Sequence, residues 1–221
     1  TTEEWTAILY KAFEAGIPHI VFTGGEPTLR EDLPDLILKA EELGLVTGLL
    51  SDGIKLADPE YRKTLLANGL DHLMMDFDPN IPEEWHILED ILAEDLFTTV
   101  HLTLHEGEDL QPHIRHLAEI GVNALSLSAV DKDLSDELHV LRNYAAVEQV
   151  DLVWDLPVPY SRNNPVSLEL EKSDAQDLPK GAGKAWLYVE PDGDVLPAQG
   201  KYDSVLGNLL TDPWEAIWEK A

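Results

Sequence analysis

The sequence predicts an α/β protein built on a parallel sheet, and three observations support this fold class. Apolar, strand-like runs recur about every 25–28 residues, which fits a repeated strand, loop and helix unit. Helical patterns, with apolar residues three and four positions apart, lie between these runs. Glycine or Asn-Gly closes the helical patterns, and a buried strand follows. Right-handed crossovers then leave an open doubly wound sheet or a barrel, and in both folds ligands bind at the carboxyl ends of the strands.

The strand-like runs begin near His19, Leu45, Asp71, Phe97, Val122 and Val150. Helical patterns cover residues 2–16, 33–43, 58–67, 83–93 and 111–120. The first of these begins at a capping box made by Thr1 and Glu4, in which each residue's side chain bonds the other's backbone N–H. The order of these elements predicts one β/α domain from residue 1 to residue 162.

The C-terminal part of the chain has a different pattern. Residues 163–184 are rich in Asn, Pro, Ser, Asp, Gly and Lys and are predicted to be a linker. Residues 185–190 alternate between two faces, with Trp186, Tyr188 and Glu190 on one and Leu187 and Val189 on the other. A turn sequence occupies 191–194, and a second strand resumes at Val195. This pattern predicts a β-hairpin, followed by a terminal helix that Asp212 and Pro213 begin, in a segment spanning 185–221.

Composition narrows the class of protein and the kind of partner. The chain has 221 residues, 44% of them hydrophobic, which is enough for one mid-sized domain with a small appendage. Its 43 acidic and 15 basic side chains give a net charge of −28, and a field of that sign repels phosphate backbones, so we expect no nucleic-acid partner. No apolar run approaches the ~18 residues of a membrane span and no signal peptide is visible, so we expect a cytoplasmic protein without a membrane partner.

The first strand runs into the sequence Thr23-Gly24-Gly25-Glu26-Pro27. Glycines at the end of a strand let a ligand approach the backbone closely, and the carboxylate of Glu26 offers an acceptor to an ammonium group. The residues by themselves therefore indicate either a small-molecule site that holds an amine, or a tight β-to-α turn with an exposed glutamate.

Gly-Gly-Glu-Pro at this place resembles the motif of the radical S-adenosylmethionine (SAM) enzymes, which contacts the methionyl amino group of SAM. The resemblance implies cofactor-binding roles for Gly24, Gly25, Glu26 and Pro27, and for residues at the ends of the next strands. Ser51 and Asp52, before Gly53, stand where the family often has Thr-Asn-Gly. Asp76 and Asp78 stand at the family's Ser-Leu-Asp position, with Asp76 in place of serine.

The C-terminal segment adds a second resemblance. Gly181 to Pro197 is similar to the opening of a SPASM-type auxiliary-cluster domain, and Leu206 to Leu210 followed by Trp214 and Trp218 is similar to its later part. The resemblance covers nearly the whole chain. It implies a partial (β/α)6 TIM-like barrel that lacks its first strand, with a C-terminal β-hairpin and helix, similar to maturases acting on peptides or on tetrapyrrole-type substrates.

The chain departs from the family in one decisive respect, because it has no cysteine. The family holds a [4Fe–4S] cluster on a Cys-x-x-x-Cys-x-x-Cys loop between its first strand and first helix. This chain begins at the position of that helix, so the loop is expected just upstream of Thr1. Two further cysteine positions of the SPASM-like segment are Lys180 and Ala198 here. Neither side chain replaces a thiolate.

Three functional hypotheses follow. The first is a degenerate or cysteine-stripped scaffold, inactive in radical chemistry, that binds SAM or another small molecule, or a peptide. The second is a fragment of an active maturase whose cluster loop lies upstream. The third is a carboxylate- or metal-dependent barrel enzyme that uses Glu26, Asp76 and Asp78. A missing first strand also leaves the strand before Glu26 with a free edge, and a homodimer is the hypothesis for what covers it.

Histidines cluster between positions 101 and 116. His101 and His105 share one strand face but lie about 13 Å apart, too far for one metal ion. A metal site using His105 with His113 is the alternative to polar barrel-mouth and surface positions.

Overall fold

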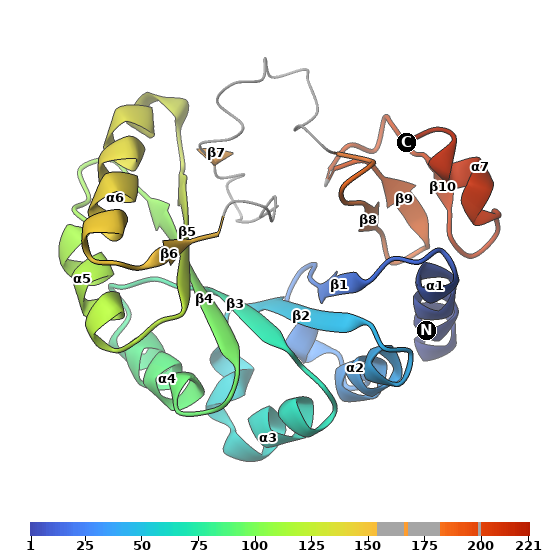
Figure 1. The fold of residues 1–221 in the computed structure, drawn as a ribbon, viewed down its shortest axis with the longest axis horizontal. Helices are drawn as coiled ribbons and strands as arrows, with labels where there is room; N and C mark the ends of the chain where they lie inside the picture. Colours follow the sequence, from blue (N-terminus) through green and yellow to red (C-terminus); the bar gives the residue numbers. More distant parts are fainter. Residues whose placement is uncertain (154–165, 168–181, 199) are drawn as a thin grey trace. The chain divides into compact units, whose positions relative to one another are not determined.

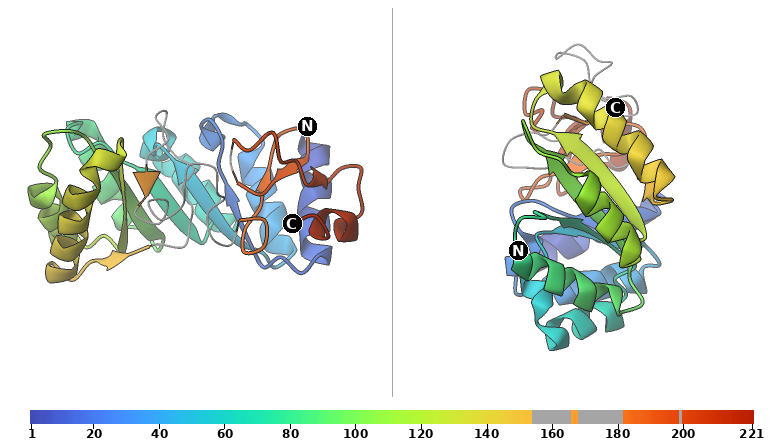
Figure 2. Two further views of the ribbon diagram at one scale, coloured as in Figure 1. Left: turned by 90° about the horizontal axis from the view of Figure 1, so that it is seen from above. Right: turned by 90° about the vertical axis from the view of Figure 1, so that its left-hand side faces the viewer.

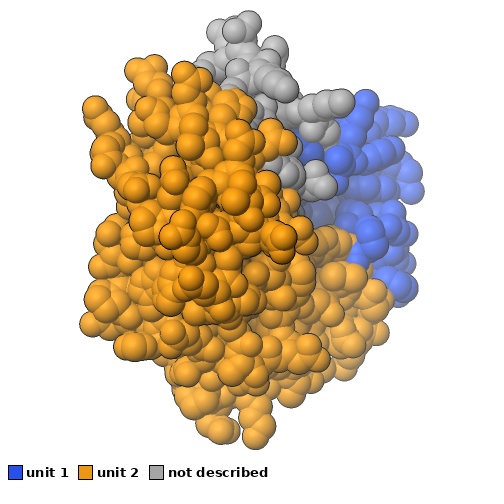
Figure 3. Space-filling view, turned by 60° about the vertical axis from the view of Figure 1, so that its left-hand side comes forward, with its two compact units in different colours: residues 1–18, 172–221 blue, residues 19–171 orange. Residues whose placement is uncertain are grey.

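The computed structural model of the protein describes residues 1–153, 166–167, 182–198 and 200–221. The chain forms two compact units, one of residues 1–18 with 172–221 and one of residues 19–171 (Figure 3). Each unit has a hydrophobic core of its own. The predicted linker, residues 163–184, lies mostly outside the described residues, so the predicted domain division at 162 and 184 stays a prediction.

The larger unit is built on a parallel sheet whose strands follow one another in chain order. The strands are β1 (His19–Phe22), β2 (Val46–Ser51), β3 (His72–Asp76), β4 (Phe97–Leu104), β5 (Ala124–Ala129) and β6 (Asp151–Leu152). They pair from β1 to β6 without interruption, and the short β7 (Val166–Ser167) pairs antiparallel with β5 (Figure 1). A doubly wound sheet would reverse its strand order at a switch point, whereas an unbroken order is that of a barrel wall. The predicted partial barrel is therefore confirmed.

Helices follow the strands and lie along one face of this sheet (Figures 1 and 2). They are α2 (Leu33–Glu42), α3 (Pro59–Ala67), α4 (Pro82–Leu92), α5 (Gln111–Glu119) and α6 (Ser135–Val147). The sequence predicts all of them except α6. Two exposed apolar side chains, Val140 and Val147, blur the period of that helix, while Leu138, Leu141 and Ala145 form its buried face.

Alternation along the strands places the core on the helix-covered face. Leu73, Met75 and Phe77 of the β3 segment join the core cluster, as do Leu102 and Leu125 on β4 and β5. Because successive side chains of a strand point to opposite faces, the residues between them lie on the other face. That second face carries polar groups, among them His72, His101, Ser126 and Ser128.

Within the part of the chain that the structure describes, β1 pairs with β2 and has no strand on its other side. This agrees with the expectation of a barrel without its first strand. The side chains of β1 are half-buried or exposed from His19 to Phe22, as befits an edge.

The smaller unit joins segments that are far apart in the sequence. It contains α1 (Thr2–Glu14), the antiparallel sheet of β8 (Tyr188–Val189), β9 (Asp194–Leu196) and β10 (Gly207–Asn208), and α7 (Trp214–Trp218). The capping box is present, with the backbone N–H of Glu4 donating to Thr1 Oγ1 at 3.2 Å. Ile8 of α1 packs with Val195 and Ile217 in the core of this unit. The predicted hairpin and terminal helix are thus confirmed.

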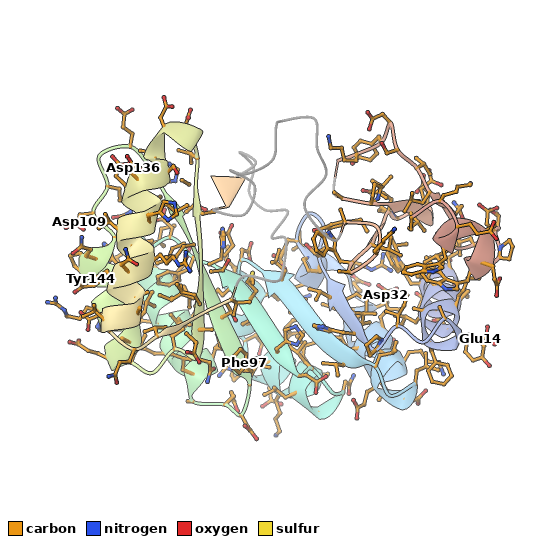
Figure 4. All side chains as sticks on the ribbon, turned by 45° about the horizontal axis from the view of Figure 1, so that its top comes forward. Glu14, Asp32, Phe97, Asp109, Asp136 and Tyr144 are labelled. Carbon is orange, nitrogen blue, oxygen red and sulfur yellow. The ribbon has the colours of Figure 1, made fainter. Side chains whose placement is uncertain are left out.

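Surface contacts tie neighbouring helices of the larger unit together. Arg115 of α5 donates to Tyr144 Oη and, at 3.2 Å, to Glu148 Oε1 beside the end of α6, where Figure 4 labels Tyr144. The described helices include none with the length and apolar character that a bilayer crossing requires.

Candidate site at the carboxyl ends of β1 to β3

The segment after β1 turns sharply before a short 3-10 helix, η1 (Pro27–Leu29). Gly24 has φ +132°, a conformation that other residues rarely adopt, and Glu26 is the N-cap of η1. A Cβ added at Gly24 or at Gly25 would meet nothing within 4 Å. Among the described residues, space is therefore open on the side of each glycine where a Cβ would stand, which suits close approach of a ligand.

The carboxylate of Glu26 is held by four hydrogen bonds. Its Oε1 accepts from the backbone N–H of Thr28 at 2.9 Å, from Thr28 Oγ1 at 2.6 Å and from Ser51 Oγ at 2.8 Å. Its Oε2 accepts from the backbone N–H of Asp52 at 2.9 Å. An ionised carboxylate has about four lone-pair sites, so these donors fix its position and orientation. The ammonium group of a ligand would meet a preoriented negative charge. It would bind the same carboxylate oxygens of Glu26 as these donors.

The turn after β2 presents the Asp52 N–H to Glu26. Ser51 is buried at the end of β2, and its Oγ accepts from the backbone N–H of Gly53 at 3.1 Å. Asp52 Oδ1 accepts from the N–H of Ile54 at 2.9 Å, which closes the turn into the 3-10 helix η2 (Ile54–Ala57). Gly53 has φ +76°, a conformation that favours glycine, and a Cβ there would lie 2.8 Å from Met75 Cε, so the Met75 side chain would have to shift.

Two residues that the sequence analysis did not single out complete this corner. Lys55 Nζ donates to the carbonyl oxygen of Thr28 at 2.7 Å and lies 4.4 Å from the centre of the Tyr61 ring. Tyr61 Oη donates to the same carbonyl at 3.5 Å. Burial, and after it the charge of Glu26, raises the pKa of Tyr61 to about 12, so the phenol keeps its proton. No local sequence motif signals these contacts, because they join residues about thirty positions apart.

Carboxylates gather at the neighbouring strand end. Asp76 ends β3, and Asp78 Oδ1 accepts from the backbone and side-chain nitrogens of Asn80 at 2.9 and 3.1 Å. The backbone N–H of Asp78 donates to Glu84 Oε2 at 2.8 Å. Burial first, and then the charges of Asp78, Asp76 and Asp52, raise the pKa of Glu84 to about 7, against the lowering effect of the hydrogen bond from the Asp78 backbone. The structure therefore brings Asp52, Asp76 and Asp78 near one another, together with Glu84, which the sequence analysis missed.

The described residues contain no group of three or more His, Asp or Glu side chains placed to hold one metal ion. The hypothesis of a carboxylate-metal barrel enzyme thus finds no ligand set in the part of the chain that the structure describes. The His105–His113 site stays a prediction; His113 lies beside Trp85, with ring centres 6.1 Å apart.

His101 is buried, which differs from the surface or barrel-mouth position expected for that cluster. Its Nδ1 lies 3.0 Å from Ser126 Oγ, and its Nε2 lies 3.0 Å from Ser128 Oγ and 3.3 Å from Thr103 Oγ1. Burial lowers the pKa of His101 to about 4, so the imidazole is neutral at physiological pH. His101 lies on β4, and Ser126 and Ser128 lie on β5. These contacts therefore link the two strands on the face of the sheet away from the helices.

Known proteins resemble this chain in sequence and in fold. No family model matches the chain. PqqA peptide cyclase of Streptomyces rochei is 29% identical over 249 residues, covering 99% of this chain and 66% of the relative. PqqA peptide cyclase of Xanthomonas oryzae pv. oryzae is 28% identical over 253 residues, covering 96% of this chain and 65% of the relative. The chain thus spans just under two thirds of the length of these relatives.

Solved structures share the fold. Streptococcus suis SuiB bound to S-adenosylmethionine matches with a TM-score of 0.71 at 15% identity, covering 98% of this chain and 57% of SuiB. SuiB bound to its precursor peptide SuiA matches with a TM-score of 0.72 over the same shares. At this identity the match concerns the fold, while the sequence relationship rests on the cyclases. Both comparisons support the resemblance to the radical SAM maturases that the sequence shows.

Proposed function

We propose that this chain is a binding scaffold that retains a small-molecule site for SAM at the carboxyl ends of β1 to β3. The observation that carries the proposal is the Glu26 carboxylate, fixed by Thr28, Ser51 and Asp52 beside the open backbone of Gly24 and Gly25. A preoriented anion next to accessible backbone suits an α-amino acid group, which the methionyl end of SAM carries.

The residues present fit SAM better than they fit an iron–sulfur cluster. Thiolates hold such clusters, and the 221 residues include no cysteine. We therefore propose no radical step for these residues. Glu26 would face the ammonium group of SAM, the backbone of Gly24 and Gly25 would border its amino-acid part, and Asp76 and Asp78 would lie at the adjacent strand end.

Titration calorimetry of the chain with SAM tests this proposal. Gly25→Ala is the sharpest variant, because the added Cβ meets nothing in the protein but takes space that the ligand needs. We expect it to weaken SAM binding about tenfold or more, and the exposed Glu31→Gln to leave binding unchanged. No binding by the unmodified chain, or equal binding by Gly25→Ala, would overturn the proposal.

A fragment of an active maturase is the second candidate, and the coverage of only 65–66% of the cyclases favours it. The intact mass of the protein from its natural source separates the two. A mass well above 24.6 kDa, with a Cys-x-x-x-Cys-x-x-Cys sequence in the additional part, would support the maturase. The chain by itself is then still expected to make no 5′-deoxyadenosine from SAM with reductant.

The relatives also suggest a peptide as partner, since the cyclases are named for one and SuiB has been solved with its precursor peptide. We further propose a homodimer through the edge of β1 that has no partner strand within the described residues, because unpaired strand edges favour association. Sedimentation equilibrium over micromolar concentrations tests the dimer, and a monomer throughout would exclude it.

A further inference from the structure

Two histidines meet at the amino ends of the strands, at the opposite end of the sheet from Glu26. His19 begins β1 and His72 begins β3, and their Nε2 atoms lie 3.1 Å apart. In the pairing of the strands, His19 stands opposite Val46 and His72 opposite Gly48. The two imidazoles therefore reach toward each other across β2, with ring centres 4.7 Å apart and planes at 65°.

Gly48 makes this meeting sterically possible. A Cβ at position 48 would lie 2.1 Å from His72 Nε2 and 2.4 Å from His72 Cε1, so any other residue would displace the ring. Glycine inside a strand weakens the strand, and it commonly marks a place where another group approaches the backbone closely. Here the group that approaches is the imidazole of His72.

The separation of the two nitrogens fits adjacent ligands of one metal ion. With metal–nitrogen bonds of about 2.0–2.1 Å, two ligands of a tetrahedral ion lie about 3.3 Å apart and adjacent ligands of a square-planar ion about 2.9 Å apart. The observed 3.1 Å, at which the two nitrogens share a hydrogen bond when no ion is bound, lies between these values. Imidazole is the side chain that Zn²⁺, Cu²⁺ and Ni²⁺ all accept.

We propose that His19 and His72 together bind one divalent transition-metal ion that ties the edge strand β1 to β3. The described residues supply these two side-chain ligands and no group of three, so water completes the coordination. The neighbouring carboxylate of Asp71 is engaged by the backbone N–H of Thr47 at 2.7 Å, and it adds negative charge near the pair. This site is separate from the proposed SAM site and does not depend on it.

The bound ion would hold β1 and β3 together. It binds the folded arrangement, in which the two nitrogens are adjacent, and therefore raises the stability of the folded state. The edge strand has the most to gain, because its backbone pairs on one side only within the described residues.

Calorimetry with Zn²⁺ on the tag-free chain tests the proposal, with Cu²⁺ electron paramagnetic resonance as a second readout. We expect one Zn²⁺ per chain, a higher melting temperature with the ion, and two coupled imidazole nitrogens in the Cu²⁺ spectrum. His19→Gln and His72→Gln should each weaken Zn²⁺ binding at least about tenfold, since loss of an outer-shell partner alone costs that much. The exposed His86→Gln is the matched control and should bind as the unmodified chain does.

Gly48→Ala keeps both ligands but moves the His72 ring, so it should also weaken binding; should it fail to fold, the two glutamine variants decide the matter. Binding of SAM by His19→Gln should equal that of the unmodified chain, which separates the two proposals. Absence of Zn²⁺ binding, or unchanged affinity in both glutamine variants, would overturn the metal site.

Discussion

Two glutamates near the carboxyl ends of β1 and β3 have opposite surroundings. Glu26, after β1, receives four hydrogen bonds from Thr28, Ser51 and Asp52, and a lysine ammonium lies nearby on the Thr28 carbonyl. Glu84, beside the end of β3, is half-buried; it receives a backbone hydrogen bond from Asp78, and the charges of Asp78, Asp76 and Asp52 act on it. Burial and neighbouring carboxylates raise the pKa of Glu84, whereas four donors fix the position of the Glu26 carboxylate.

Removing the carboxylate of Glu26 should have the largest effect on stability. Glu26→Ala leaves the donors of Thr28, Ser51 and Asp52 without their acceptor, and an unsatisfied buried donor costs about 1–3 kcal/mol. We expect a loss of about 3–4 kcal/mol in the free energy of unfolding, because water can reach part of this corner. Urea unfolding measures it, with the exposed Glu31→Ala as control. A loss below about 1 kcal/mol would mean that the four bonds add little.

The turn that presents Asp52 to Glu26 can be tested through Gly53. Gly53→Ala forces an alanine into φ +76° and places its Cβ 2.8 Å from Met75 Cε. Gly44→Ala is the matched control, because Gly44 has φ +77° with nothing within 4 Å of an added Cβ. We expect about 1 kcal/mol of loss for Gly44→Ala and about 2–3 kcal/mol for Gly53→Ala, measured by thermal or urea unfolding. Equal losses would show that Met75 moves aside freely.

Glu84→Gln should raise the stability of the chain, whereas Glu26→Ala should lower it. The pKa of Glu84 is raised to about 7 in the folded chain, from its ordinary value of 4.5. The folded state therefore binds its proton more tightly than the unfolded state, and the contribution of Glu84 to stability falls as pH rises from about 4.5 to about 7. A neutral glutamine that still accepts from Asp78 removes this penalty.

We expect Glu84→Gln to be more stable than the unmodified chain by about 1 kcal/mol at pH 8, after allowance for solvent screening, and near equal at pH 4. Unfolding free energies at a series of pH values measure the difference. Glu83→Gln, on the exposed side of the same helical turn, should show no such trend. A variant that is less stable at pH 8 would contradict the assignment.

Lys55→Met should give the smallest change of the four. It removes the hydrogen bond to the Thr28 carbonyl and the cation over Tyr61, for a loss of about 1 kcal/mol. Lys39→Met, which removes an exposed pair with Glu42 at 3.1 Å, should lose less than about 0.5 kcal/mol. The difference between the two losses measures whether Lys55, near Glu26, contributes more to the free energy of unfolding than a lysine at an ordinary surface site.

The periodicity of the sequence is sufficient to predict the strands, because buried parallel strands and their glycine-closed helices leave a regular pattern. Helix α6 escapes that pattern, since Val140 and Val147 are apolar and exposed. At the site, the sequence indicates Glu26, Ser51 and Asp52, and the structure brings these three into contact. Glu84 could not be found in this way, because its raised pKa comes from burial and from the charges of Asp78, Asp76 and Asp52, which approach it only after folding.

The pairing of α1 with the C-terminal hairpin has a consequence for synthesis on the ribosome. Ile8 and Leu9 are buried in the folded chain, and Ile8 packs against Val195 and Ile217, about two hundred residues later. At about 5–20 residues per second, that separation corresponds to roughly 10–40 s of translation. Throughout this interval the apolar face of α1 has emerged without its partners, and a nascent chain of this kind is a natural client for chaperones that shield exposed helices.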